Sequence, residues 1–127
     1  MQVLQEIELC DEQRDVCKRK LALFDTGAKS SFIDEEFAKE FGYSKFDTPR
    51  EITLATKHRT TEIIGDVVLR ITLDDCEMPS RTILNVIEGL TKPVILGTDF
   101  MELFDIELDT KEGRARLKRC PPEMLLI

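Results

Sequence analysis

The sequence has 127 residues, of which 42% are hydrophobic and 34% are charged, and it carries a formal net charge of −7. This length and composition predict a single domain over residues 1–127, large enough to bury a core of its own. The acidic balance argues against nucleic acid as the main partner, because phosphate binding draws on Lys and Arg. The apolar runs are too short to cross a bilayer, and the start lacks the features of an export signal. We therefore expect no membrane association and a cytoplasmic protein.

The cysteines are Cys10, Cys17, Cys76 and Cys120, and no pair has the spacing of a zinc or redox motif. With a single histidine besides, the chain offers a poor set of ligands, so we expect no metal and no cofactor. Cys10 and Cys17 could face each other across a hairpin and form a disulfide. Without an export signal, however, free thiols are the expectation for all four.

The first half of the chain reads as two strands, a short helix and a loop. Residues 3–9 alternate between apolar and polar side chains, and a second strand ends in the apolar run 21–24. Asp34 is a suitable N-cap for a short helix that Gly42 would stop. Residues 43–50 are polar, contain a proline and predict a loop.

The second half of the chain contains short apolar segments separated by polar turns, and it predicts strands at 52–55, 62–73, 81–87, 94–97, 106–108 and 114–118. The first two of these segments would be the arms of a long hairpin. A helix starting from Thr98 or Asp99 would run to Phe104. Many short strands with two short helices predict an all-β fold with a closed sheet.

One motif carries chemistry. Asp25-Thr26-Gly27 follows the apolar strand end 21–24, and an acidic residue at the end of a buried strand needs stabilising partners. Thr26 supplies a hydroxyl, and Gly27 permits a sharp turn and a close approach by another chain. The same tripeptide also suits an ordinary β-turn, which is a common structure. Its position after a buried strand, with a second apolar strand ending in Gly97, favours a functional site.

Two segments, LALFDTGAKSSFIDEEFAKEFG and VILGTDFMELFDIELD, resemble the retropepsin family, the aspartic proteases of retroviruses, retrotransposons and their cellular relatives. The resemblance extends in order and spacing from about Val3 to Lys118. It implies a retropepsin-like closed β-barrel with one or two short helices, active as a two-fold homodimer.

The resemblance also implies residue roles. Asp25 would be the catalytic carboxylate, and Thr26 would reach across to its counterpart in the partner. Gly27 would line the floor under the substrate backbone. The hairpin at 54–64 would be a flap that closes over the substrate. The residues expected to support the active-site loop are Thr26, Gly27, Ala28, Ile95, Leu96 and Gly97.

The substrate would be an extended polypeptide in an apolar cleft, and the residues expected to line it are Gly27, Lys29, Ile33, Leu54, Ala55, Thr56, His58, Ile63, Ile64 and Leu84. Lys29 would favour acidic groups if it lines the cleft, but it is as readily a solvated side chain. His58 fits an exposed flap residue better than a substrate contact. The expected flap tip lacks the glycines that are usual in retroviral members.

The number of catalytic carboxylates in the chain also requires a dimer. The tripeptides Asp47-Thr48-Pro49 and Asp109-Thr110-Lys111 lack the glycine, so the chain holds one such motif. Peptide hydrolysis by carboxylates needs one group as base and one as acid, and two close carboxylates share a proton. The second Asp25 must therefore come from another copy of the chain across a two-fold axis.

The sequence thus predicts an aspartic endopeptidase. A retropepsin-fold dimer that binds peptides or proteins without cleaving them stays open, and so does a turn in an unrelated β-barrel. The apolar C-terminal segment 123–127 could pair with the partner in a dimer sheet or could be disordered.

Overall fold

The fold was analysed in a computed structural model, which describes residues 1–54 and 59–124. Its strands are β1 (Gln2–Cys10), β2 (Cys17–Asp25), β3 (Phe32–Asp34), β4 (Ser44–Leu54), β5 (Arg59–Leu73), β6 (Cys76–Glu77), β7 (Thr82–Ile87), β8 (Val94–Leu96), β9 (Ile106–Asp109) and β10 (Arg114–Leu117). Its helices are α1 (Glu35–Ala38) and α2 (Thr98–Leu103). With 54% strand and 8% helix, the structure confirms the all-β prediction.

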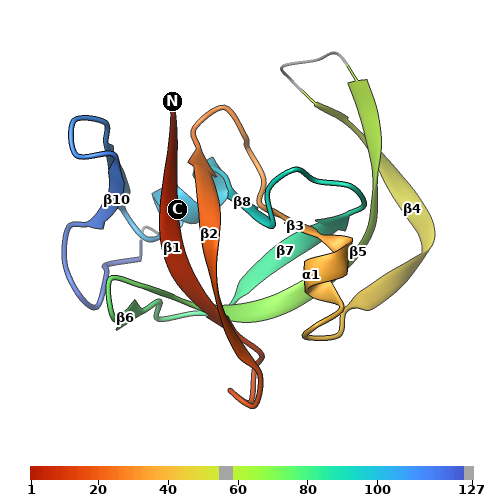
Figure 1. Ribbon diagram of the computed structural model, residues 1–127, viewed down its shortest axis with the longest axis horizontal. Coiled ribbons are helices and arrows are strands. Elements are labelled where there is room, and N and C mark those ends of the chain that lie inside the picture. The colour runs from red at the N-terminus through yellow and green to blue at the C-terminus, as the bar shows by residue number, and fades with distance from the viewer. Residues whose placement is uncertain (55–58, 125–127) are drawn as a thin grey trace.

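One large sheet organises the molecule, with strand order β1-β2-β8-β3-β7-β5-β4. An additional pairing between β1 and β5 joins strands from opposite sides of this order into a ring. Strands β9 and β10 form a separate hairpin, which lies on the opposite side of the molecule from the β4–β5 hairpin (Figure 1). The pairings β2–β8 and β3–β7 are parallel, and they bring distant parts of the chain to the end of β2.

The core follows from alternation along the strands, since successive side chains of a strand point to opposite faces. In β1 the residues Val3, Ile7 and Leu9 are buried, as the sequence pattern predicts. In β2 the buried residues are Ala22 and Phe24. Side chains of these strands, of β5, β7 and β8 and of both helices form one main core. The alternate residues of β2, including Asp25, therefore belong to its other face.

The helix starts agree with the sequence in one case and differ in the other. The Asp34 carboxylate accepts a hydrogen bond from the Glu36 N–H at 3.2 Å, which confirms the predicted N-cap of α1. Helix α2 begins after Gly97, which offers no side chain for capping. The predicted cap by Thr98 or Asp99 is therefore wrong, and Asp99 instead bonds to Ser31, as described below.

The loop predicted for residues 43–50 is also wrong, because β4 begins at Ser44. Its pairing with β5 is irregular between Lys45 and Arg50, and β4 has β5 as its single neighbour in the order of the sheet. An edge strand needs no apolar face and tolerates Pro49, which lies in this irregular part and has no partner in the β4–β5 register. The predicted hairpin is present, with Thr53 opposite Thr60.

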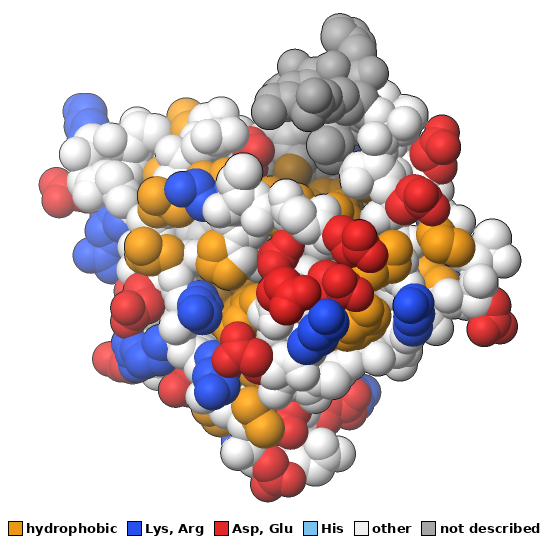
Figure 2. Space-filling view, turned by 45° about the vertical axis from the view of Figure 1, so that its right-hand side comes forward, with side chains coloured by type: hydrophobic (Ala, Val, Ile, Leu, Met, Phe, Trp, Pro, Cys, Tyr) orange, Lys and Arg blue, Asp and Glu red, His pale blue; other side chains and the backbone are white. Residues whose placement is uncertain are grey.

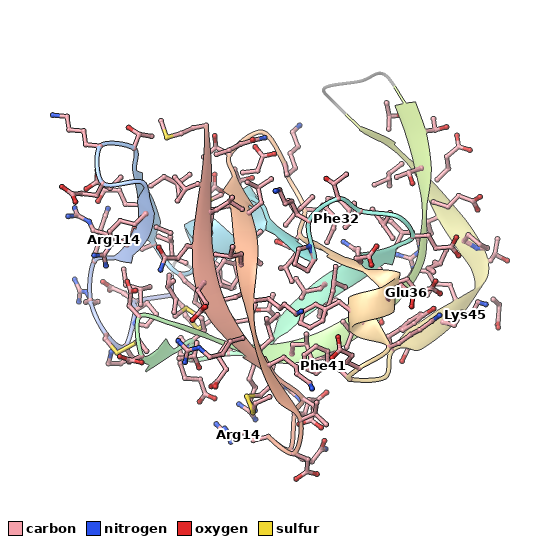
Figure 3. The ribbon with its side chains drawn as sticks, viewed as in Figure 1. Arg14, Phe32, Glu36, Phe41, Lys45 and Arg114 are labelled. Carbon is pink, nitrogen blue, oxygen red and sulfur yellow. A yellow bond between two sulfur atoms is a disulfide. The ribbon has the colours of Figure 1, made fainter. Side chains whose placement is uncertain are left out.

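Both pairs of cysteines form disulfides, so the prediction of free thiols is wrong. Cys10 and Cys17 face each other across the β1–β2 hairpin with Cα atoms 4.1 Å apart. The second disulfide joins Cys76 of β6 to Cys120, which follows β10, with Cα atoms 6.0 Å apart. Figure 3 shows the first of these near Arg14 and the second on the side of β6. Within residues 1–54 and 59–124, no helix is long and apolar enough to cross a membrane.

Candidate active site

The Asp25-Thr26-Gly27 motif lies at the end of β2, where the strand turns away from the sheet. The Gly27 N–H donates to Asp25 Oδ1 at 2.8 Å, and the Ala28 N–H donates to the Asp25 carbonyl oxygen at 3.1 Å. A Cβ atom on Gly27 would lie 3.1 Å from Asp25 Oδ1, a tight contact. The turn thus holds the carboxylate by a short hydrogen bond and leaves it partly exposed.

Met1 and Gln2, just before and at the start of β1, also contact the motif, and no local sequence pattern indicates these contacts. Gln2 lies opposite Asp25 in the register, and its Nε2 donates to Asp25 Oδ2 at 3.2 Å. The carbonyl oxygen of Met1 accepts from the Thr26 N–H at 3.0 Å and from Thr26 Oγ1 at 3.3 Å. The Thr26 hydroxyl therefore has a hydrogen-bond partner in its own chain.

The turn between β8 and α2 packs directly against the active-site loop. The Thr98 N–H donates to the Ala28 carbonyl oxygen at 2.8 Å. A Cβ atom on Gly97 would lie 2.5 Å from the carbonyl oxygens of Ala28 and Ser30, so only glycine fits there. Leu96 is fully buried and pairs with Phe24 in the β2–β8 register. This geometry supports the role expected for the segment 95–97.

Ser31 connects the same two segments from inside the protein and is a fully buried polar residue. Its Oγ donates to Asp99 Oδ1 at 2.7 Å and accepts from the Gly97 N–H at 3.0 Å. Asp99 Oδ1 also accepts from the Phe100 N–H at 2.7 Å. The hydroxyl thus satisfies a backbone donor that has no partner in the first turn of α2. Sequence reasoning did not single out Ser31.

An apolar surface extends from Asp25 along the face opposite the main core. In register, Leu23 pairs with Ile95, and Ile95 pairs with Phe32, so these side chains share that face. Phe32, Ile63 and Ile87 form a second cluster, against which Phe46, Ile52, Leu90 and Ile95 pack. Figure 3 labels Phe32 between the β1–β2 side of the sheet and the β4–β5 hairpin. This surface is a candidate floor for an extended polypeptide.

Three of the predicted cleft residues belong elsewhere. Ile33 and Leu84 are completely buried in the main core, and Ile64 packs against that core. Neither Ile33 nor Leu84 therefore presents a surface to a substrate. Ile63 is the member of the predicted apolar set that lies in the second cluster. Strand β7 lies within the strand predicted at 81–87, whereas β3 was not predicted as a strand. The residues expected to face the cleft from these two segments lie on the core face, so Phe32 and Ile87 were missed.

Some of the predicted residues fall outside the part of the chain that the structure describes. Ala55, Thr56 and His58 lie outside the described residues, and the side chain of Leu54 does as well. Lys29 is exposed in the active-site loop, with Gly27 before it also exposed. The backbone of the arms of the predicted flap is described as far as Leu54 and Arg59, which pair in register.

Charged side chains of both signs stand next to one another on the surface, as Figure 2 shows for one face. Lys39 lies 3.2 Å from Glu36 on α1, and the Arg14 guanidinium lies 2.7 Å from Glu77. The hydrogen bond from Arg14 lowers the pKa of Glu77. A hydrogen bond to Glu35 at 2.6 Å raises the pKa of Tyr43 to about 12. These groups lie outside the motif and its immediate partners.

A pocket of about 320 Å³ lies beside the motif, lined by Met1, Thr26, Thr98, Met101, Glu102, Asp105, Ile106 and Leu108. It is formed by the chain start, the active-site loop, α2 and β9. Met1 is 64% exposed, although its backbone holds Thr26. The chain therefore presents an open and partly apolar face next to Thr26.

A family model described as aspartyl protease matches residues 14–100, which include the motif, the hairpin and the turn at Gly97. The chain belongs to the aspartyl protease family. The retropepsin-like resemblance drawn from the sequence is thereby confirmed. No curated protein matches the sequence closely enough to count as a relative.

The fold of this member of the aspartyl protease family is also found in a solved structure. It is similar to the retroviral protease-like domain of Ddi1 from Leishmania major, with a TM-score of 0.66 and 17% sequence identity over 98% of this chain and 95% of that one. A Legionella pneumophila protein of unknown function, Lpg0085, matches with a TM-score of 0.42 and 16% identity over 78% of this chain and 83% of that one. The similarity to the Ddi1 domain shows that the two chains share a fold.

Proposed function

We propose that the chain is an aspartic endopeptidase that acts as a two-fold homodimer, with one Asp25 from each protomer. The observation that carries the proposal is the carboxylate at the end of β2, partly exposed and held by the Gly27 N–H at 2.8 Å. Membership of the aspartyl protease family supports it. In this proposal residues 1–127 are one catalytic domain, and the ring of strands is the closed barrel expected from the sequence.

The reaction requires Asp25 in two protonation states, ionised in one protomer and protonated in the other. One Asp25 takes a proton from a water molecule, whose oxygen forms a bond to the carbonyl carbon of the peptide. The other Asp25 holds a proton and gives it to the carbonyl oxygen, which becomes a hydroxyl of the tetrahedral intermediate. As the C–N bond breaks, the first Asp25 gives the proton that it took from water to the amine nitrogen. A hydroxyl of the intermediate returns a proton to the other Asp25, which leaves a carboxyl group on the product and restores the shared proton of the pair. A pair of close carboxylates shares one proton readily, so we expect activity in mildly acidic solution.

The open face beside Thr26 is the proposed site of contact between protomers. The pocket of about 320 Å³ there is lined by apolar side chains from α2 and β9 together with the exposed Met1. A two-fold axis near this face brings the two motifs together. The apolar surface of Leu23, Ile95 and Phe32 then forms the floor for an extended substrate. We therefore expect cleavage next to large apolar residues.

The disulfides favour an oxidising environment for the working protein over the cytoplasm expected from the sequence. Intact mass measured with and without a thiol-alkylating reagent, on protein purified without reductant, tests this. Alkylation at four sites in the unreduced protein would contradict it.

The function is tested by cleavage of a diverse pool of unfolded peptides from about pH 3.5 to 7.5, a range that brackets the titration of a carboxylate pair. Wild type is compared with Asp25→Asn, and sedimentation measures the dimer in both. Cleavage by wild type alone supports the proposal, and mixed dimers of wild type with Asp25→Asn should be inactive. A stable dimer that binds peptides but cleaves none would favour the binding module instead.

A further inference from the structure

Gln2 contacts the carboxylate on which the proposed function depends. Its Nε2 donates to Asp25 Oδ2 at 3.2 Å, while the Gly27 N–H donates to Oδ1 at 2.8 Å. The two carboxylate oxygens therefore have different donors, one from β1 and one from the loop after β2. Gln2 belongs neither to the motif nor to the residues that the family resemblance assigned to the site.

The position of Gln2 is fixed by the strand that carries it. Strands β1 and β2 pair without interruption from Gln2 opposite Asp25 to Cys10 opposite Cys17, and the disulfide closes the far end. The neighbouring Met1 carbonyl accepts from both the N–H and the hydroxyl of Thr26. A slip of the register by one residue would turn Val3, Ile7 and Leu9 out of the core. The amide of Gln2 is thus presented to Asp25 by a strand that cannot shift.

The chemistry of the amide suits this place. The terminal torsion of an aspartate is broad, so a single donor on one oxygen leaves the carboxylate free to rotate. A second donor on the other oxygen fixes its plane. A neutral carboxamide provides this donor without adding charge, whereas Lys or Arg would bring a cation to a pair that must share a proton.

We propose, on the basis of the proposed function, that Gln2 is a positioning residue. It orients the Asp25 carboxylate in each protomer for proton exchange with the water that attacks the peptide and with the peptide itself. It acts through Asp25 and does not itself take part in proton transfer. The first strand of the chain is then part of the active-site machinery, although it lies far from the motif in sequence.

The test uses the full chain with Gln2→Met, which keeps the shape of the side chain but removes the donor, and with Gln2→Glu. The matched control is Gln5→Met, because Gln5 lies on the same strand but points to the opposite face. We expect Gln2→Met to lower kcat about tenfold at every pH, as loss of one hydrogen bond to a charged group does, with KM and Tm unchanged. Gln5→Met should keep the kcat of wild type.

Gln2→Glu separates positioning from a structural role through its pH profile. Below about pH 4.3 a glutamic acid is protonated and can donate to Asp25, and above this pH it adds a second negative charge. The ratio of wild-type to variant kcat should therefore rise with pH. Among the described residues, the titratable group that Gln2 contacts is Asp25, and the Met1 amino group is next to it in the chain. Glu102 and Asp105 line the pocket beside Met1 and Thr26.

Three results would overturn the inference: wild-type kcat in Gln2→Met, an equal loss in Gln5→Met, or a ratio for Gln2→Glu that does not change with pH. If wild type cleaves nothing, the proposed function fails on its own, and the contact is tested by nuclear magnetic resonance. The side-chain amide signal of Gln2 should then move in Asp25→Asn, where the acceptor loses its charge. An unchanged signal would refute the contact.

Discussion

The substitution Gly97→Ala tests how closely the turn between β8 and α2 packs against the active-site loop. The added Cβ atom would lie 2.5 Å from the carbonyl oxygens of Ala28 and Ser30, whereas real Cβ contacts stay beyond 3.0 Å. Both obstacles are backbone, so the loop must move away by about 0.5 Å, the difference between these two distances. The Thr98 N–H bond to the Ala28 oxygen at 2.8 Å would be strained by the same shift.

Overpacking of this kind costs about 1–3 kcal/mol of unfolding free energy. A displacement of the loop that carries Asp25 should cost more in function, because a misplacement of about 1 Å can lower a rate about a hundredfold. We expect Gly97→Ala to lose between about tenfold and a hundredfold in kcat. Urea denaturation gives the stability, and peptide cleavage gives the rate.

Gly42→Ala is the control, because its cost in stability has another origin. Gly42 has a φ of +80° and no atom within 4 Å of the added Cβ, so alanine is strained by its backbone alone. It should lose about 1–2 kcal/mol of stability and keep full activity per folded molecule. If Gly97→Ala is as stable and as active as wild type, or if Gly42→Ala loses the same activity, the reasoning about the loop is refuted.

Ser31→Ala should cost about 1–3 kcal/mol in urea denaturation, because it leaves a buried backbone donor unpaired, and an unchanged midpoint would contradict this. Replacing both Cys76 and Cys120 by Ser should lower the free energy of unfolding by about 4 kcal/mol, and replacing both Cys10 and Cys17 should lower it by about 2 kcal/mol. The difference arises because the paired cysteines are 44 and 7 residues apart, and a longer closed loop restricts the unfolded chain more. The reverse order of the two losses would refute this argument. Tyr43 is the one tyrosine of the chain, so its ultraviolet titration should report a pKa of about 12, falling in Glu35→Gln. Because this pKa is raised, the stability linked to Tyr43 is present below about pH 10 and is lost as the pH rises through about 12.

The parts of the fold that carry strong local patterns were predictable. The alternation in residues 3–9, the Asp34 cap and the apolar strands before Asp25 and Gly97 all have direct signals, and the structure has these elements. The motif and the family resemblance placed the candidate site at the end of β2. The supporting position of Gly97 followed from the same resemblance, and its atomic reason is the lack of room for a Cβ.

The errors have physical causes. Strand β3 has three residues, too few for an alternation that shows which of Phe32 and Ile33 faces the core. The first part of the edge strand β4, residues 44–50, is exposed and mostly polar, and its sequence cannot be distinguished from that of a loop. The contact of Gln2 with Asp25 joins residues 23 positions apart and depends on the register of the hairpin. No local pattern carries that information.

The two disulfides also determine whether the fragments of a cleaved chain stay covalently joined. A cut between residues 77 and 119 falls inside the loop closed by Cys76 and Cys120, and the two pieces stay covalently joined. A cut between residues 18 and 75 falls outside both loops and releases two separate fragments. An endopeptidase that nicked itself in the β4–β5 hairpin would therefore come apart on a gel without reductant. A nick near α2 would show only after the disulfides are reduced.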